Sequence, residues 1–441
     1  SNLNSAVAVS DLNNSGSSEI VANSQSGMIS CLDGTGEMLF QYEAGGQLRS
    51  NPMIVDINSD GNFEIVALTF TNPQLIVLKH DGTDFPGFPV AISGPVMSSP
   101  SSADLNGDGH KEIIFNTSAG NLHAISTATG EDLAGWPVSI ASASWSGPII
   151  GDLTGNNQPD IVIANVQGNV FAFDREGNEI FARNTGNQIR SGLIVHDLDN
   201  DGNSEIVFGD MGGNIFVLDG NGADWGLFPV NTGHFIEHTP ALADMNGDGN
   251  LEIIYGDNGG YLHSLNISGN ETANFPIKLA SSATASPAID YISGDNNPDI
   301  VIPTGSFYNF IDFKRPIGVI GWGYFKGSIR RTGNSFDLTG VESVPEEIVM
   351  ATALLGNYPN PFNPETRISF SLASENNVSI NIYNIRGQLV KELLSDRLGS
   401  GEHSVVWNGK DDRGRAVSSG LYFYRLQTEN YRAVRKKMLL K

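Results

Sequence analysis

The chain has 441 residues and a formal net charge of −24, from 49 acidic and 25 basic residues. This length exceeds what one hydrophobic core usually holds, so we expect at least two domains. The excess of acids argues against nucleic-acid binding, which needs clustered cations. The 51 glycines and a charged fraction of 17% are typical of turn-rich β structure. Cys31, the single cysteine, excludes an intrachain disulfide, and its alternating strand predicts a packed side chain.

The charge is distributed unevenly along the chain. Residues 357–441 contain 13 Lys and Arg against 8 Asp and Glu, a net charge of +5, whereas the preceding residues carry −29. We therefore expect a first domain at 1–335, a linker at 336–356 and a second domain at 357–441. No apolar run reaches the roughly 18 residues of a transmembrane segment. Ser1 is neither an initiator methionine nor part of a signal peptide, so we expect a processed or truncated product.

The first domain carries an internal repeat. The pattern Asp-x-Asn/Asp-x-Asp-Gly-x-x-Glu, followed by Ile-Val or Ile-Ile, recurs in six copies, and a seventh has Tyr291 in place of the first acid. Successive copies start 45, 48, 48, 45, 47 and 47 residues apart. This spacing fits a four-stranded propeller blade, so seven copies predict an all-β, seven-bladed β-propeller. The first acids are Asp11, Asp56, Asp104, Asp152, Asp197 and Asp244.

Each copy predicts the same order of strands. An apolar segment such as residues 240–243 precedes the acidic loop, a β-branched segment such as 112–115 follows it, and a glycine turn leads to a third strand such as 213–219. The fourth segment contains Phe-Pro or Trp-Pro in four copies. Because proline lacks the donor that a central strand needs, we expect these segments at the outer edge of each blade. They are Phe88-Pro89, Trp136-Pro137, Phe228-Pro229 and Phe275-Pro276.

The acidic loops are candidate calcium sites. A hard cation takes six to eight oxygens, and alternate residues of a tight loop converge on one point. The alternative is that these loops are Asx turns, in which Asn, Asp and Gly are favoured without any metal. The best candidates are Asp56, Asn58, Asp60 and Glu64; Asp104, Asn106, Asp108 and Glu112; Asp197, Asp199, Asp201 and Glu205; and Asp244, Asn246, Asp248 and Glu252. Weaker candidates are Asp11, Asn13, Glu19, Asp152, Asp160, Asp295 and Asp299.

These residues resemble the FG-GAP/VCBS family of β-propellers, whose blades carry Asp-x-Asp-x-Asp-Gly calcium loops. The resemblance covers about residues 1–335. It implies bound calcium with a structural role.

A second candidate site comes from aligning the copies on the first acid. The residues seven and six positions before it vary, while the flanking strands repeat. In a propeller they lie near the channel mouth, on the face opposite the acidic loops, so our hypothesis is a glycan or peptide site. The alternative is that they only fill loops. The candidates are Arg49, Trp145, Arg190 and His238. The string His234-Phe235-Ile236-Glu237-His238 resembles an inverted zincin motif, but it abuts a predicted strand where that motif needs a helix.

The second domain has alternating segments and turns that predict about seven short strands, an Ig-like β-sandwich. It resembles the type A C-terminal sorting domain of the type IX secretion system. The resemblance implies export by the type IX translocon, with outer-membrane shuttle proteins as partners, and either attachment to surface lipopolysaccharide or release outside the cell. The residues that carry it include Asn357, Pro359, Asn360, Pro361, Phe362, Gly387, Gly420, Lys436, Lys437 and Lys441.

The sequence therefore predicts a secreted or cell-surface binding or adhesion protein with a non-catalytic propeller stabilised by calcium. Two alternatives stay open. The chain is an accessory region of a larger secreted hydrolase or polysaccharide lyase whose catalytic domain lies upstream of Ser1, or the propeller itself is an enzyme acting on polysaccharide.

Overall fold

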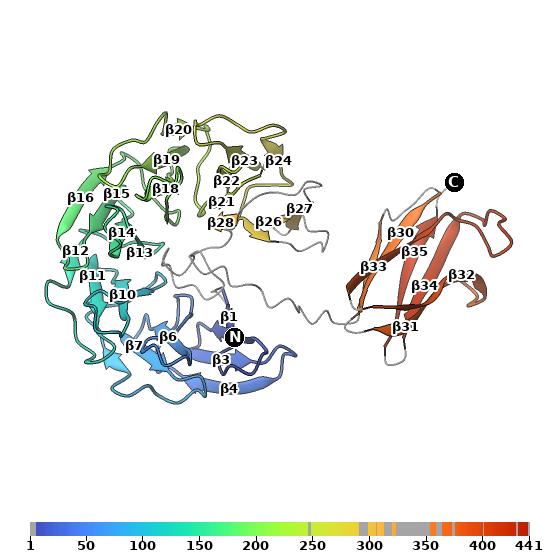
Figure 1. Ribbon diagram of the computed structural model, residues 1–441, viewed down its shortest axis with the longest axis horizontal. Helices are drawn as coiled ribbons and strands as arrows, with labels where there is room; N and C mark the ends of the chain where they lie inside the picture. Colours follow the sequence, from blue (N-terminus) through green and yellow to red (C-terminus); the bar gives the residue numbers. More distant parts are fainter. Residues whose placement is uncertain are drawn as a thin grey trace. The chain divides into compact units, whose positions relative to one another are not determined.

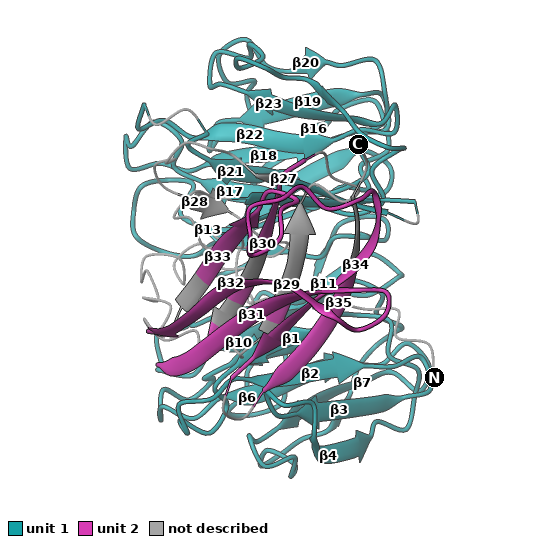
Figure 2. Cartoon of the chain, turned by 90° about the vertical axis from the view of Figure 1, so that its right-hand side faces the viewer, with its two compact units in different colours: residues 1–340 teal, residues 341–441 magenta. Residues whose placement is uncertain are grey.

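The structure is a computed structural model that describes residues 6–245, 248–290, 299–305, 307–312, 320–322, 353–358, 364–372, 375–399, 401–428 and 431–439. The chain divides into two compact units, residues 1–340 and 341–441, which Figure 2 distinguishes by colour. Every regular element of the described residues is a β-strand. None of these residues forms a helix long and apolar enough to cross a bilayer.

The first unit is a β-propeller. Its described residues form seven sheets, one for each copy of the acidic repeat, and within each sheet the strands contributed by that copy pair antiparallel in sequence order. Figure 1 shows the sheets following one another around the unit in chain order. The first strands contact those of neighbouring sheets and form the inner ring. They are β1 (Ala8–Ser10), β5 (Met53–Val55), β9 (Ser101–Ala103), β13 (Ile149–Gly151), β17 (Ile194–His196), β21 (Ala241–Ala243) and β25 (Ala288–Asp290).

The second and third strands hold the core of each sheet. Five second strands, β6 among them, are buried along their whole length, as expected for β-branched runs packed on both faces. The second strands are β2 (Glu19–Asn23), β6 (Glu64–Leu68), β10 (Glu112–Asn116), β14 (Asp160–Ala164), β18 (Glu205–Gly209), β22 (Glu252–Gly256) and β26 (Asp299–Thr304). The third strands are β3 (Met28–Leu32), β7 (Gln74–Leu78), β11 (Asn121–Ile125), β15 (Asn169–Phe173), β19 (Asn214–Leu218), β23 (Tyr261–Leu265) and β27 (Phe307–Asp312).

Hydrophobic contacts join consecutive sheets. Met53 and Val66 of the second sheet pack in one buried cluster with Ile113 and Phe115 of the third. Burying such a side chain contributes about 1.5–3 kcal/mol, so the interfaces between sheets hold the unit together. Cys31 is fully buried in the cluster between the first two sheets, which confirms that it packs as a small hydrophobic residue.

The outer strands confirm the prediction drawn from the Phe-Pro and Trp-Pro pairs. Each of these pairs directly precedes a two-residue strand at the edge of its sheet. Three sheets lack the pair in their sequences, and of these the first and the fourth have six-residue edge strands instead. The outer strands are β4 (Met38–Glu43), β8 (Val90–Ala91), β12 (Val138–Ser139), β16 (Glu179–Asn184), β20 (Val230–Asn231) and β24 (Ile277–Lys278).

The last two sheets depart from the four-stranded pattern within the described residues. The seventh contains β25, β26 and β27. The sixth gains a fifth strand, β28 (Ile320–Trp322), which pairs antiparallel with the inner strand β21 so that Trp322 lies opposite Leu242. The end of the propeller sequence thus returns to the inner ring.

The second unit consists of two sheets around one core. One has the order β29-β30-β33 and the other β32-β31-β34-β35. Ile368 and Phe370 of the first sheet share a buried cluster with Ile380 and Tyr424 of the second. The strands are β29 (Ala353–Tyr358), β30 (Thr366–Leu372), β31 (Asn376–Asn384), β32 (Leu389–Leu398), β33 (Gly401–Trp407), β34 (Gly420–Gln427) and β35 (Arg432–Leu439).

The first strand of this unit begins inside the stretch that we assigned to the linker. Residues 353–356 belong to β29, and Leu354 is buried in the core of the unit. The sequence does not predict a strand here because Gly356 and Asn357 interrupt the apolar residues. The pairing with β30 is irregular between Leu354 and Gly356. The segment forms a strand because it pairs with β30, although its local sequence has a weak preference for strand.

Candidate functional site

The acidic loops connect the first strand of a sheet to the second. The first acid follows the inner strand directly, and the ninth-position acid is the first residue of the second strand. Glycine at position six adopts positive φ, for example 85° at Gly61 and 94° at Gly202, which confirms why the pattern requires it. In the fourth copy Asn157 takes this position with φ of 58°.

The first acid of each loop organises the backbone of the turn. One of its carboxylate oxygens accepts a hydrogen bond from the amide at position five, and the other accepts one from the amide at position six. In the loop that begins at Asp197 these bonds are 3.1 and 2.9 Å long. The same pair of bonds forms at Asp11, Asp56, Asp104, Asp152 and Asp244. These are Asx-type turns, so hydrogen bonds from backbone amides to the aspartate side chain account for the shape of the loop.

The ninth-position acid is buried beneath the loop and attached to its start. Its carboxylate accepts a hydrogen bond from the amide at position two, as Glu205 does from Leu198 at 2.8 Å. The residue at position two is apolar and buried in all six copies. The equivalent pairs are Glu19 with Leu12, Glu64 with Ile57, Glu112 with Leu105, Asp160 with Leu153 and Glu252 with Met245.

Burial disfavours the charged form of these acids. It raises the pKa of Glu64, Glu112 and Glu205 to about 7, opposed by the backbone hydrogen bond and reinforced by the neighbouring aspartates. The pKa of Asp160 rises to about 6 for the same reason. Asx turns do not account for this crowding of carboxylates, which a cation would relieve.

One loop brings three carboxylates together. Ligand oxygens of Asp197, Asp199 and Glu205 lie within 4.8 Å of one another, the only such group of three acidic or metal-binding side chains among the described residues. This loop has aspartate at position three where three other complete copies have asparagine. In the loop that begins at Asp104 the amide of Asn106 donates to Asp108 and Glu112, at 3.0 and 3.1 Å, and thereby links those carboxylates itself.

The remaining predicted calcium ligands belong to loops in which three carboxylates do not converge, or lie outside the described residues. Burial raises the pKa of Glu19, whose loop has Ser15 at position five. Asn13 accepts a hydrogen bond from the Ser15 amide at 2.9 Å, as Asn58 does from Asp60 at 3.2 Å. Asp299 is fully buried at the start of β26. Asn246 and Asp295 lie outside the described residues.

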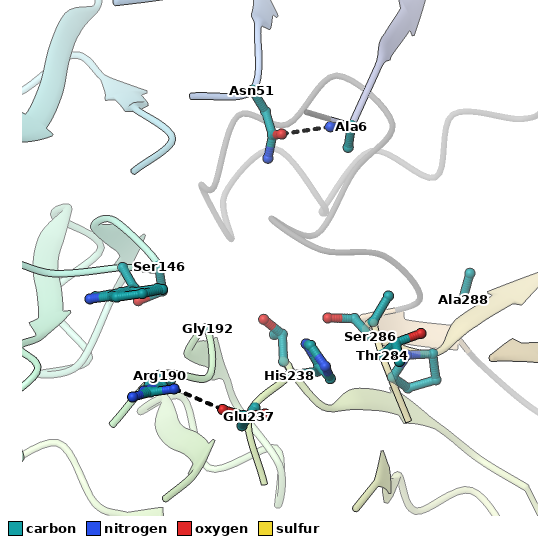
Figure 3. Close-up of a pocket in the computed structure, with 14 residues that line it drawn as sticks. Ala6, Asn51, Ser146, Arg190, Gly192, Glu237, His238, Thr284, Ser286 and Ala288 are labelled. Atoms are coloured by element: carbon teal, nitrogen blue, oxygen red, sulfur yellow. Dashed lines mark hydrogen bonds and ion pairs between the residues drawn. The ribbon is translucent and has the colours of Figure 1, made fainter. Parts of the chain in front are cut away.

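A pocket of about 520 Å³ opens at the other end of the inner strands. Acidic loops follow these strands in the sequence, whereas the pocket residues precede them, so the two candidate sites lie at opposite ends of the inner ring. Four lining residues occupy the same repeat position, seven before the first acid or its replacement, in consecutive sheets. They are Trp145, Arg190, Glu237 and Thr284. Figure 3 shows the close-up, in which labelled residues from several sheets surround the pocket.

Three of the four residues that we predicted for a ligand site line this pocket, namely Trp145, Arg190 and His238. Arg49 is not among the lining residues, and its guanidinium carbon lies 3.7 Å from the ring centroid of Phe70. The repeat position found by the sequence alignment supplies lining residues from four sheets, but the alignment did not indicate which copies face the pocket. Glu237 and Thr284 stand at the same position, so the same signal could have selected them.

The pocket combines one exposed aromatic ring with an ion pair. Trp145 is 55% exposed. The Arg190 guanidinium carbon lies 5.4 Å from the Trp145 ring centroid, and its Nη1 donates to Glu237 Oε1 at 3.0 Å, drawn as a dashed line in Figure 3. Burial lowers the pKa of His238, so that its imidazole is neutral at pH 7. The ion pair and the neutral imidazole leave these groups with no net charge.

Rigid backbone presents these side chains. Buried residues flank each of them, Ser144 and Ser146 beside Trp145 and Ser191 beside Arg190. The Ser191 hydroxyl donates to the carbonyl of Gly209 at 2.8 Å. Ile236 precedes Glu237, is fully buried, and donates its amide to Asp210 at 3.0 Å. A ligand would therefore meet preformed positions, which lowers the entropic cost of binding.

Two histidines, His123 and His263, stand at equivalent third-strand positions and have structural surroundings. His123 stacks on Phe115, with ring centroids 5.2 Å apart, and its Nδ1 lies 3.0 Å from Asp132. His263 stacks on Tyr255 at 4.9 Å and lies between Asp257 and Glu271. The string of residues 234–238, which resembles an inverted zincin motif, forms no helix and lies in the loop before β21, as expected from its position next to a predicted strand.

The predicted export residues of the second unit are described only in part. Gly387 has φ of 74° in the turn between β31 and β32, and Gly420 begins β34. Asn357 lies in β29, while Lys436 and Lys437 lie in the edge strand β35, where the Lys436 side chain is exposed. Pro359, Asn360, Pro361, Phe362 and Lys441 lie outside the described residues.

The sheets and the acidic loops that connect their first two strands place this chain among β-propeller proteins. Family models identify the two parts. The model described as an FG-GAP-like repeat matches residues 104–163 and 197–255, and the model described as a secretion system C-terminal sorting domain matches residues 357–441. The chain therefore carries FG-GAP-like propeller repeats followed by a type IX secretion sorting domain. This sorting domain indicates export to the cell surface or the extracellular space and interaction with the secretion machinery.

Solved structures with a similar arrangement include BBS1N in complex with ARL6DN, which is 11% identical with a TM-score of 0.49 and covers 72% of this chain and 95% of its own. BamB from Moraxella catarrhalis is 15% identical, with a TM-score of 0.43 and coverage of 71% and 97%. The V. cholerae biofilm matrix protein Bap1 is also 15% identical, with a TM-score of 0.44 and coverage of 99% and 67%. No curated protein matches the chain in sequence.

Proposed function

We propose that this protein is a secreted, non-catalytic binding or adhesion protein whose propeller holds a ligand in the pocket lined by Trp145, Arg190 and His238. The observation that carries the proposal is the origin of the lining. One repeat position supplies a different side chain from each of four consecutive sheets, on a backbone that otherwise repeats. Variable side chains on a rigid repeating scaffold are what a specific binding site requires.

The test is binding of the full chain to immobilised bacterial and plant polysaccharides and to a peptide panel. The variant Trp145→Ala with Arg190→Ala should lose binding. The matched control is Arg49→Ala with Met97→Ala, which changes the same repeat position in the second and third sheets, where the residue at that position does not line the pocket. Equal binding by wild type and the pocket variant would refute the proposed site. Release of unsaturated products from a bound polysaccharide would instead favour the lyase alternative.

Calcium is proposed as the structural cofactor of the acidic loops. The converging oxygens of Asp197, Asp199 and Glu205 and the raised pKa of the ninth-position acids support it, because oxygen ligands and unrelieved negative charge suit a hard cation. Bound calcium would stabilise the folded loops and would take no part in ligand chemistry. The remaining complete loops, which have asparagine at position three, would bind it through the same positions.

Export is proposed to end in one of two ways. The sorting domain is removed as the propeller is attached to surface lipopolysaccharide, or it is removed as the propeller is released, with outer-membrane shuttle proteins acting in between. The intact mass of the secreted protein tests this. A mass that ends before about residue 357 supports removal, and a mass that includes Lys441 refutes it.

A further inference from the structure

The chemistry of the pocket also limits the kind of ligand that it can hold. We infer that the pocket at the channel mouth binds an uncharged oligosaccharide, with one sugar ring stacked on the exposed ring of Trp145. This inference rests on the proposed binding function and names its ligand class.

The aromatic ring provides the first argument. Trp145 is 55% exposed and presents a large amphipathic ring at the pocket. The Arg190 guanidinium carbon lies 5.4 Å from the ring centroid, and the 55% exposure of Trp145 leaves ring surface accessible to a ligand. A flat ligand with an apolar face and a polar edge fits this surface, because aromatic side chains with a polar rim favour such amphipathic partners. Pyranose rings have that construction.

The polar groups provide the second argument. Guanidinium groups only donate hydrogen bonds and carboxylates only accept them, and Arg190 and Glu237 present one of each 3.0 Å apart. Neighbouring hydroxyls of a sugar both donate and accept, so a pair of them can bond to both groups at once. Asn51 is already engaged, since it accepts from the Ala6 amide at 2.7 Å and donates to Ser99 at 2.9 Å.

The charge of the surroundings provides the third argument. Arg190 is neutralised by Glu237, and burial keeps the His238 imidazole uncharged, so these groups offer no free cation to an anionic ligand. The residues before 357 carry a net charge of −29, which repels polyanions at long range. Acidic polysaccharides are therefore disfavoured.

A peptide fits the pocket less well. Peptides are usually bound along a free sheet edge or in an apolar groove. The pocket has a single large apolar side chain, and most of its remaining lining is small or polar, as at Gly192, Thr239 and Ser286. Its volume of about 520 Å³ is in the range of small-ligand sites.

The experiment is saturation-transfer NMR followed by calorimetry on the full chain with calcium present. The probes are neutral hexasaccharides of glucose, mannose and xylose, hexagalacturonate as the acidic counterpart, and a pool of uncharged hexapeptides. We expect at least one neutral hexasaccharide to bind, with affinity about tenfold lower in Trp145→Ala and unchanged in Met97→Ala, which removes an exposed side chain at the same repeat position outside the pocket.

The outcomes separate the two proposals. Binding of hexagalacturonate or the peptides that depends on Trp145, with no binding of neutral sugars, would overturn the ligand class and leave the binding site in place. Binding of neutral sugars that Trp145→Ala does not weaken would overturn the position of the site. No binding of any probe would overturn the inferred ligand class, and failure on the immobilised panel as well would overturn the binding function.

Discussion

Replacement of Glu205 by glutamine should stabilise the propeller when calcium is absent and destabilise it when calcium is bound. Glu205 is 3% exposed beneath its loop, and burial raises its pKa from 4.5 to about 7. At about 1.4 kcal/mol per pKa unit, this rise means that the ionised side chain costs the folded state about 3 kcal/mol. Relative to the ionised side chain, protonated Glu205 favours the folded state. This contribution to the free energy of unfolding is fully present below pH 4.5 and is lost as the pH rises through about 7.

At pH 8 in EGTA the wild type therefore contains an ionised, buried Glu205, whereas Glu205→Gln contains a neutral group of the same shape. We expect the variant to be more stable there, by up to about 3 kcal/mol. With millimolar calcium the order reverses, because the carboxylate then binds a cation and the amide does not. At pH 4.5 in buffer freed of calcium by chelating resin, the two proteins should have nearly equal stability, since Glu205 is protonated in the folded wild type.

Differential scanning calorimetry measures the unfolding of the propeller in the four combinations of protein and calcium at each pH. Glu179→Gln is the matched control, because this glutamate is exposed on the outer strand β16 and the change should have no effect in any condition. If Glu205→Gln is no more stable than the wild type in EGTA at pH 8, the carboxylate is not under electrostatic stress. If calcium raises the unfolding temperatures of both proteins equally, this loop does not bind calcium through Glu205.

Three further changes test other parts of the structure. His263→Ala should destabilise the propeller by about 3 kcal/mol in urea denaturation, because it leaves the buried carboxylate of Asp257 without this partner. His123→Ala should cost less, because its partner Asp132 is 26% exposed. Equal losses of stability in the two variants would contradict this reasoning. Burial raises the pKa of the Cys31 thiol to about 12. Iodoacetamide at pH 8 should therefore label the native protein negligibly and the urea-unfolded protein completely. Rapid labelling of the native protein would show that the first two sheets separate. Trp407→Ala removes a fully buried side chain of the second unit and should lower the stability of that unit alone by about 3–5 kcal/mol. Calorimetry should show a shift of one unfolding transition. A shift of both transitions would mean that the two units unfold together.

The repeat made much of the fold predictable from the sequence. Spacing near 47 residues, an acid directly after an apolar segment and glycine at position six are local features, and each forces a local structure whatever surrounds it. The Phe-Pro and Trp-Pro pairs likewise located the edge strands, because a missing donor has the same consequence in every sheet. The sorting domain was recognisable because the residues that carry its resemblance, such as Asn357, Gly387 and Gly420, are read directly from the sequence.

The tertiary structure decided which repeated positions act together. Arg190 and Glu237 are 47 residues apart and meet only because consecutive sheets pack side by side, while Arg49 at the same repeat position lies against Phe70. The local sequence around each residue is the same in kind, so no local pattern separates them. The same holds for Leu354, which enters a core only because β30 pairs with its strand. Periodicity determines which residues can face a site, and the packing of distant segments determines which of them do.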